Sequence, residues 1–324
     1  MSILDLLRKN RSQQNSYHAA RYVEPIKDDW KEPEYDYAPE RYTKNYPRKY
    51  AMTSYVILED GVVFTRDVKD YLLRDLVKRV IFTDAPFPEG FKLVDLSLDQ
   101  DRSILGWNQT IGGDLCLVVS TGEKGKGIEF NEACNFMFAG FENLKSIEWN
   151  NVITTRNLIS VRQMFAGCEE MKYLDLSCFD MSNVKYMEGM FSTCEKLENI
   201  KWFRFNTSKV EDVSYLFTNC HALRSVDFRN FDSKSLSKCK KMFNRCGARA
   251  VNLGNWSANK ELDIENMFHT TGLMTILTTE NEHVKHLFLN PPDAETADCL
   301  KENDLCRKIV PDSEWKIPTY AWDK

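Results

Sequence analysis

The sequence lacks the short motifs that mark the commonest catalytic and cofactor sites. Its 324 residues contain no glycine loop for phosphate, no Cys-x-x-Cys pair and no His-Glu-x-x-His segment. These absences argue against nucleotide-dependent, dithiol redox and zinc-protease chemistry. We therefore expect a protein that is not an enzyme and that holds no cofactor and no metal ion.

Long apolar runs are also missing. No stretch approaches the ~20 apolar residues that a membrane-spanning helix needs. The opening segment MSILDLLRKNR breaks its apolar patch with Asp5 and places its basic residues afterwards, the reverse of a secretory signal. We expect no membrane association, a cytoplasmic location and reduced thiols, with association with a virus particle as the alternative.

The chain has no strong charge of either sign. Its net charge of −5 argues against nucleic acid as the main ligand. Ten cysteines are sparse for a disulfide scaffold of this length. The 43% of apolar residues is enough to bury a sizeable core, so global disorder is not expected.

A repeat occupies the middle of the chain. MFAGCEEMKYLDL, MFSTCEKLENIKW, LFTNCHALRSVDF and MFNRCGARAVNL start one period apart, and a weaker copy flanks them on each side. One phenylalanine anchors each copy, with separations of 27, 26, 26, 26 and 25 residues. The anchors, which we expect to form the structural core, are Phe138, Phe165, Phe191, Phe217, Phe243 and Phe268.

Each copy reads as a strand, a polar turn and a short helix. In LxxIxW, alternation directs Ile200 and Trp202 inward. Val184, Met187 and Phe191 recur at the three- and four-residue steps typical of a helix. We therefore predict an α/β fold: a leucine-rich-repeat solenoid of about six 25–27-residue coils, each a strand plus a short helix.

A cysteine follows each anchor by three residues in four of the copies. The first copy has Phe141 at this position, which indicates that the position is used for packing. Buried free cysteine behaves as a small hydrophobic residue, so we interpret this column as core thiols rather than a redox site. Its members are Cys168, Cys194, Cys220 and Cys246.

These motifs resemble those of a known repeat family. MFxxCxxL, the 26-residue period and the turn FDMSNV make residues 128–277 similar to the BspA-like leucine-rich repeat family of bacterial surface proteins. The resemblance implies a solenoid that binds other macromolecules, commonly in adhesion, without catalysis. Members of that family usually carry a secretion signal and an anchor, and this sequence shows neither.

Outward strand positions supply one set of candidate partner-binding residues. Glu198 occupies the position that holds Lys172 and Arg224 in the copies before and after it, and Lys201 the position that holds Asp175 and Asp227. Opposite charges therefore lie on adjacent strands. Two interpretations stay open. The charged side chains form ion pairs only with one another across the strands, or they form a surface that binds a partner. The candidates are Lys172, Tyr173, Asp175, Glu198, Asn199, Lys201, Arg224 and Asp227.

An N-terminal arm supplies the other set. Residues 1–50 hold seven of the 13 tyrosines and four of the ten prolines, which favours an extended segment. We consider a tail without a partner, an arm that wraps a partner or a second subunit, and a minor nucleic-acid contact. The arm candidates are Tyr17, Tyr22, Trp30, Tyr35, Tyr37, Tyr42 and Tyr46.

The repeats are expected to lie between two caps. Residues 51–127 predict a small α/β cap, with a hairpin in SYVILEDGVVF turning at Asp60-Gly61 and a helix over 67–82. The solenoid itself takes residues 128–278. A C-terminal cap over 279–324 contains a helix that starts at Pro292 and Asp293.

Weaker candidates for chemistry have structural interpretations. Four residues could in principle bind zinc, but their spacing matches no standard zinc site, so we predict no metal there. Asp180, Asn206 and Asp232 recur at the turns, where capping is favoured over calcium binding. The zinc candidates are His283, His286, Cys299 and Cys306.

Together these observations predict a protein that binds another protein or a protein assembly without catalysing a reaction. An intracellular inhibitor of a partner complex is the leading hypothesis. The alternatives are a structural or receptor-binding component of a phage particle or other assembly, and a secreted adhesin. Self-association through the arm is a further expectation.

Overall fold

The structure is a computed structural model of the chain. It describes residues 51–52, 55–58, 61–64, 73–99, 101–202, 206–254, 256, 262–269, 276–278, 281–290 and 309–310. All of these belong to one compact unit, residues 47–324. The predictions for the arm, including its seven candidate aromatic residues, and for the helix after Pro292 lie outside the described residues.

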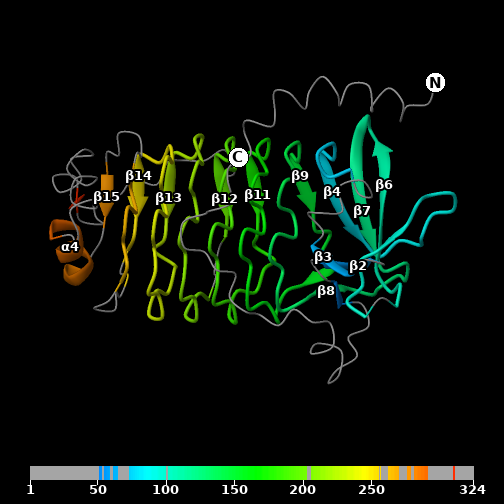
Figure 1. Ribbon diagram of the computed structural model, residues 1–324, viewed down its shortest axis with the longest axis horizontal. Coiled ribbons are helices and arrows are strands. Elements are labelled where there is room, and N and C mark those ends of the chain that lie inside the picture. The colour runs from blue at the N-terminus through cyan, green and yellow to red at the C-terminus, as the bar shows by residue number, and fades with distance from the viewer. Residues whose placement is uncertain are drawn as a thin grey trace. The chain divides into compact units, whose positions relative to one another are not determined.

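The described chain begins with two small sheets. β4 (Arg79–Thr83), β5 (Val94–Asp95), β6 (Leu105–Ile111), β7 (Asp114–Ser120) and β9 (Ser146–Glu148) form one sheet in the order β5-β6-β7-β4-β9. β1 (Ala51–Met52), β8 (Ile128–Phe130) and β10 (Ile153–Thr154) form a parallel sheet in the order β1-β8-β10. In the first sheet β4 pairs in parallel with both β7 and β9, so this sheet leads directly into the repeats (Figure 1).

The hairpin predicted near Asp60 is present, with its turn shifted by one residue. β2 (Tyr55–Leu58) and β3 (Gly61–Phe64) pair antiparallel, and Leu58 is opposite Gly61. Gly61 is therefore the first residue of the second strand, and the two-residue connection is 59–60.

The helix predicted over 67–82 is wrong where the structure describes that segment. Residues 79–83 are strand β4, whose side chains alternate between buried and half-buried positions. The sequence RVIFT is rich in β-branched and aromatic residues, and pairing with strands on both sides stabilises its extended form.

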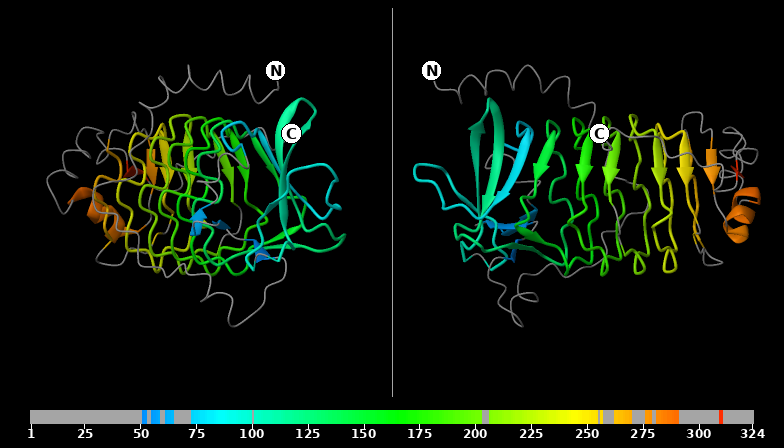
Figure 2. Two further views of the ribbon diagram at one scale, coloured as in Figure 1. Left: turned by 45° about the vertical axis from the view of Figure 1, so that its right-hand side comes forward. Right: turned by 180° about the vertical axis from the view of Figure 1, so that it is seen from behind.

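Short parallel strands continue along the repeats. β11 (Tyr173–Asp175) pairs with β12 (Asn199–Lys201). A separate sheet contains β13 (Ser225–Asp227), β14 (Ala250–Asn252), β15 (Ile276–Thr278) and β16 (Ile309–Val310), in that order. Figure 1 and the right-hand view of Figure 2, seen from behind, show β11 to β15 following one another in one row. β12 and β13 belong to different sheets, so the strand row is interrupted between them.

The predicted α/β fold class is wrong. Among the described residues the only helix is α4 (Glu282–Leu289), and no solenoid of strand-plus-helix coils is evident. The segments that carry the three- and four-residue apolar spacing are not helical. They form a second ladder of isolated parallel bridges from Ala133 through Ser160, Tyr186 and Asp212 to Lys238 and Asp263.

Hydrogen bonds explain why these segments do not coil into helices. Alternate backbone N–H groups donate to the next repeat, as Gly189 N does to Ser214 O at 2.8 Å and Phe191 N to Leu216 O at 3.1 Å. The residues between them close tight local turns, such as Met190 N to Met187 O at 3.1 Å. This pattern buries residues at steps of three while satisfying the backbone between repeats rather than within one.

Left-handed backbone positions enforce the same geometry. Residues two before and two after an anchor phenylalanine have positive φ, as at Gly189 (58°) and Thr193 (60°) on either side of Phe191. The corresponding residues of the next repeat are Tyr215 (59°) and Asn219 (61°). A right-handed helix cannot pass through such residues, so each repeat turns sharply twice at its anchor.

The anchors pack as one column inside the stack. Phe165, Phe191 and Phe217 are fully buried, and their rings stack with centroids 5.9 Å and 5.6 Å apart at interplanar angles of 5° and 8°. Phe138, Phe243 and Phe268 extend the column at both ends. The core is therefore shared between repeats, and no repeat buries its anchor alone.

Candidate functional site

The pairing of β11 with β12 gathers six of the candidate side chains on one surface. Tyr173 is opposite Asn199, and Asp175 is opposite Lys201. Lys201 Nζ lies 2.8 Å from Asp175 Oδ2, and Lys172 Nζ lies 3.5 Å from Glu198 Oε1. We call this surface the β11–β12 face; it consists of Lys172, Tyr173, Asp175, Glu198, Asn199 and Lys201.

Tyr173 is the most exposed large apolar side chain among the described residues, at 49%. Its hydroxyl donates to Glu198 Oε2 at 2.9 Å, and this bond raises the pKa of Tyr173. The carboxylate of Glu198 thus contacts both Lys172 and Tyr173. The aromatic ring is held on the surface by a cross-strand polar network.

The other two strand candidates are not part of this face. Arg224 and Asp227 flank or belong to β13, which lies in a different sheet from β12. Asp227 forms its ion pair with Arg229, at 2.7 Å. The opposite charges predicted on adjacent strands therefore form ion pairs between β11 and β12, whereas Asp227 pairs within its own turn.

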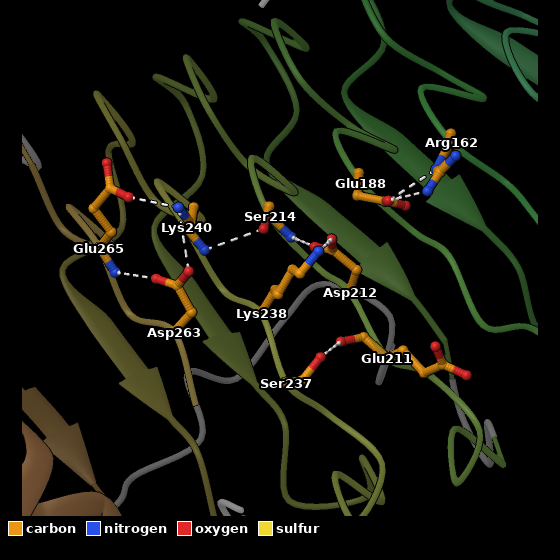
Figure 3. Close-up of polar contacts among 10 residues, drawn as sticks. All are labelled: Arg162, Glu188, Glu211, Asp212, Ser214, Ser237, Lys238, Lys240, Asp263 and Glu265. Atoms are coloured by element: carbon orange, nitrogen blue, oxygen red, sulfur yellow. Dashed lines mark hydrogen bonds and ion pairs between the residues drawn. The ribbon is translucent and has the colours of Figure 1, made fainter. Parts of the chain in front are cut away.

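A second polar column was missed by the sequence analysis. It lies on the bridge ladder, at the positions three and five residues before each anchor (Figure 3). Arg162 Nε donates to Glu188 Oε1 at 2.8 Å, and the guanidinium stacks 4.6 Å from the ring of Tyr186. Lys240 Nζ lies 3.2 Å from Asp263 Oδ2 and 2.7 Å from Glu265 Oε2. The sequence signal was opposite charge at equivalent positions of successive repeats, as in Arg162 with Glu188, Asp212 with Lys238 and Lys240 with Glu265.

The Arg162–Glu188 end of this column is more buried than the β11–β12 face. The side chains of Arg162 and Glu188 are 9% and 11% exposed. Burial raises the pKa of Glu188 from its ordinary value, Asp212 adds to that effect, and Arg162 opposes it. Its contacts run between successive repeats, so its first role is to hold the stack together.

The cysteine column is buried and does more than fill space. Cys168, Cys194 and Cys220 are fully buried, and each thiol donates to the carbonyl of a phenylalanine in the preceding repeat at 3.1–3.2 Å. Burial raises the pKa of the Cys194 and Cys246 thiols to about 12, and it also raises those of Cys168 and Cys220 well above the ordinary value. These thiols stay protonated at neutral pH and are not nucleophiles there.

The turn residues act as backbone caps in the structure. Asp180 and Asn206 side-chain oxygens accept from the N–H of Ser182 at 2.9 Å and Ser208 at 3.1 Å, and Asp232 accepts from Lys234 N at 3.2 Å. No cluster of three or more metal-binding side chains occurs within the described residues. His283 and His286 belong to α4, while Cys299 and Cys306 lie outside the described residues.

α4 was not predicted from the sequence. Its signal is Asn281, whose side-chain oxygen accepts from Val284 N at 3.1 Å as an N-cap. With eight residues, α4 is far too short to cross a bilayer, and the described part of the chain contains no helix long and apolar enough to do so.

Comparison with known proteins corrects the resemblance drawn from the sequence. Residues 159–278 match the model of a family described as "Mycoplasma protein of unknown function, DUF285". The resemblance to the BspA-like leucine-rich repeats is therefore corrected: the matching family is a different one, and its description states no function. The searches of curated proteins and of solved structures returned no match.

Proposed function

We propose that the protein is a protein-binding module whose β11–β12 face contacts another protein. The observation that carries this proposal is the exposed ring of Tyr173 among side chains fixed by cross-strand ion pairs. Tyrosine is enriched among the residues that dominate protein interfaces. Charged side chains that are already held in one conformation lose less entropy when a partner binds.

The polar network also supports recognition of a protein rather than of a nucleic acid. Lys172 and Lys201 are each paired with a carboxylate of the same face. Their charge is thus balanced locally, whereas a phosphate backbone requires a net positive surface. A partner with its own mixed charges around an apolar pocket for Tyr173 fits this face.

We place the protein in the cytoplasm as part of the same proposal. All eight cysteines that the structure describes are free thiols, and Cys178 among them is exposed. Reducing compartments preserve such thiols, whereas oxidising ones tend to pair them.

The proposal is tested by capture from an extract of the native source, with full-length protein as bait. We expect the wild type to retain a specific protein and Tyr173→Ala to lose it. Phe91→Ala is the matched control, because Phe91 is also an exposed aromatic residue, at 40%, outside the face. Retention of the same protein by Tyr173→Ala, or capture of none by the wild type, contradicts the proposal.

A second variant separates stability from recognition on the same face. Exchanging Glu198→Lys and Lys201→Glu together places like charges opposite Lys172 and Asp175. If the double variant is less stable but captures the same protein, the ion pairs of this face contribute only to folding. Loss of capture without a change in the thermal midpoint supports recognition.

A further inference from the structure

Strand β6 has an open edge along most of its length. β7 pairs with all seven of its residues, from Leu105 to Ile111. On its other side, β5 pairs with Leu105 and Gly106 alone. Figure 1 shows the β6–β7 hairpin at the end of the strand row, with β6 outside β7. Residues 107–111 therefore have no neighbouring strand on that side within the described part of the chain.

The backbone groups that face this edge can be identified from the ladder. Leu96 N donates to Ile104 O at 3.0 Å, so residues 104 and 106 direct their backbone groups toward β5. Because the direction alternates along a strand, the N–H and C=O groups of Asn108 and Thr110 point to the same side. There they meet no strand, and Thr110 is exposed.

Strand β6 itself carries no charge, proline or bulge, three features that commonly prevent strand addition. Its sequence, LGWNQTI, contains no charged residue and no proline. All seven residues pair in unbroken register with β7, so no bulge twists the edge away. Natural edge strands are usually protected by one of these features. An edge left regular and neutral is suited to accept another strand.

We propose that β6 pairs antiparallel with β6 of a second copy of this chain, about a two-fold axis at Thr110. The inference goes beyond the proposed function, because it concerns self-association at a different surface. A neutral strand meets no like charge when it faces its own copy, whereas β11, β12 and β13 each carry an Asp or a Lys. Antiparallel pairing of identical strands is also the symmetric arrangement that closes a dimer.

The position of β5 selects the register. β5 occupies the lane opposite Leu105 and Gly106, so the incoming strand must end before that point. With Thr110 opposite Thr110 of the partner subunit, Asn108 is opposite Gly112 of the partner subunit, where the hairpin turns. This register gives about two backbone hydrogen bonds between the opposed Thr110 residues, because Gly112, with a φ of 62°, has already left the extended conformation.

An apolar cluster lies beside this edge. Trp107, Cys116 and Val118 are buried together on one face of the sheet, and Ile111 is only partly covered against them. In the proposed register, Ile111 of the partner subunit lies opposite Gln109, whose side chain accepts from Trp107 Nε1 at 3.2 Å. Pairing would extend the cover of this cluster across the two-fold axis.

Sedimentation equilibrium of the full-length chain over roughly 1–100 µM tests the proposal, a range that detects dissociation constants typical of modest interfaces. We expect a monomer–dimer equilibrium for the wild type. Thr110→Pro removes a donor from the open edge, and Thr110→Lys places two like charges beside the axis. Neither disturbs bonds to β7, and each should weaken dimerisation at least about tenfold. Ser177→Lys, an equally polar change at an exposed turn residue, should dimerise as the wild type does.

A cross-linking experiment tests the register itself. In a Cys178→Ser background, Thr110→Cys should form a disulfide-linked dimer on mild oxidation, because Cα atoms of directly opposed residues lie about 5.5 Å apart. Gln109→Cys is the control, since its two copies would be offset along the strands. Peptide mapping identifies the linked residue.

Three outcomes overturn the proposal. The first is a wild type that stays monomeric over the whole range. The second is a dimer that both Thr110 variants leave unchanged, which places association on another surface. The third is equal cross-linking at positions 109 and 110. If the chain is monomeric and Thr110→Pro instead abolishes capture of another protein, the edge accepts a foreign strand and the second-copy assignment is wrong.

Discussion

Single aromatic rings connect each repeat to its neighbours. Phe191 has no exposed surface and stacks between Phe165 and Phe217, while Trp202 packs edge-on against it. We predict that Phe191→Ala lowers the free energy of unfolding by ~3–5 kcal/mol, because the cavity removes contacts to two other repeats at once. Chemical denaturation checks this value. Phe91→Ala, at an exposed position, should change the free energy of unfolding by less than ~0.5 kcal/mol, and equal effects of the two substitutions would refute the shared core.

Thiol reactivity distinguishes buried from exposed cysteines. Partial burial raises the pKa of Cys178 to about 11, and full burial raises that of Cys194 to about 12. Only the thiolate is alkylated, so labelling of Cys178 in the native protein should be slow at pH 8 and should rise roughly tenfold per pH unit toward pH 11. Cys194 should stay unlabelled at pH 9, because the reagent cannot reach it.

Mass spectrometry of digested protein measures both rates. In denaturant the two cysteines should react alike, which provides the control. Labelling of Cys194 in the folded protein as fast as Cys178 would show that the cysteine column faces solvent.

At the scale of the element, the segment around each anchor phenylalanine determines whether the repeat contains a helix or tight turns. The apolar spacing of Val184, Met187 and Phe191 matches a helix, which is why the sequence analysis predicted one. The structure uses the same spacing for two tight turns with left-handed residues between them. Apolar periodicity indicates only which side chains are buried. A helix and the observed pair of turns would both bury these three side chains.

The glycines at these turns were the signal that could have excluded a helix. Gly167 and Gly189 both have positive φ, and each occupies one of the two left-handed positions of its repeat. Gly140 shares the column of Gly167, two residues after its anchor, but Thr193 and Asn219 hold that position in later repeats, so glycine marks only part of the column. A prediction from a single copy could not separate a helix from this arrangement.

Thr193 is the least suitable of these left-handed residues, because its β-carbon is branched. We predict that Thr193→Gly raises the free energy of unfolding by about 1 kcal/mol through relief of backbone strain. Thr218, one residue after the next anchor, has no positive φ, and its hydroxyl donates to Lys241 O at 2.8 Å. Thr218→Gly should therefore destabilise by about 1 kcal/mol or more. Denaturation of both variants tests the pair, and the same sign for both would contradict the assignment of strain.

At the scale of the whole molecule, the repeat period was readable from the sequence, but the sheet boundaries were not. The outward positions of β11 and β12 followed from alternation within LxxIxW. The interruption between β12 and β13 did not, because their sequences differ by ordinary substitutions and the pairing depends on how neighbouring repeats meet. For the same reason Arg224 and Asp227 could be placed on a column but not on the β11–β12 face.

The charges of the polar column on the bridge ladder allow us to predict which repeat can be deleted with the smaller loss of stability. Deleting residues 191–216 removes one period and joins Met190 to Phe217 in the same register. On the bridge ladder this deletion brings Glu188 opposite Lys240, an attractive pair. Deleting residues 217–242 instead brings Asp212 opposite Asp263, a repulsive pair.

The exposed strand row favours the opposite order. Deleting residues 191–216 places Lys172 opposite Arg224 and Asp175 opposite Asp227, whereas the other deletion places Glu198 opposite Arg249. These side chains are mostly exposed, and exposed pairs contribute only ~0.2–1 kcal/mol each. Glu188 and Asp212 are nearly buried, at 11% and 12% side-chain exposure, where an unfavourable neighbour costs more.

We therefore predict that the chain without residues 191–216 is the more stable of the two, by at least about 1 kcal/mol. Both should fold and unfold cooperatively, with denaturant sensitivities slightly below that of the full chain, because each exposes less surface on unfolding. Urea titration followed by circular dichroism measures both quantities. A 13-residue deletion from the same region is the control, since it breaks the register and should abolish cooperative unfolding. If the chain without residues 217–242 proves more stable, then the exposed strand row rather than the buried column sets the order in which repeats stack.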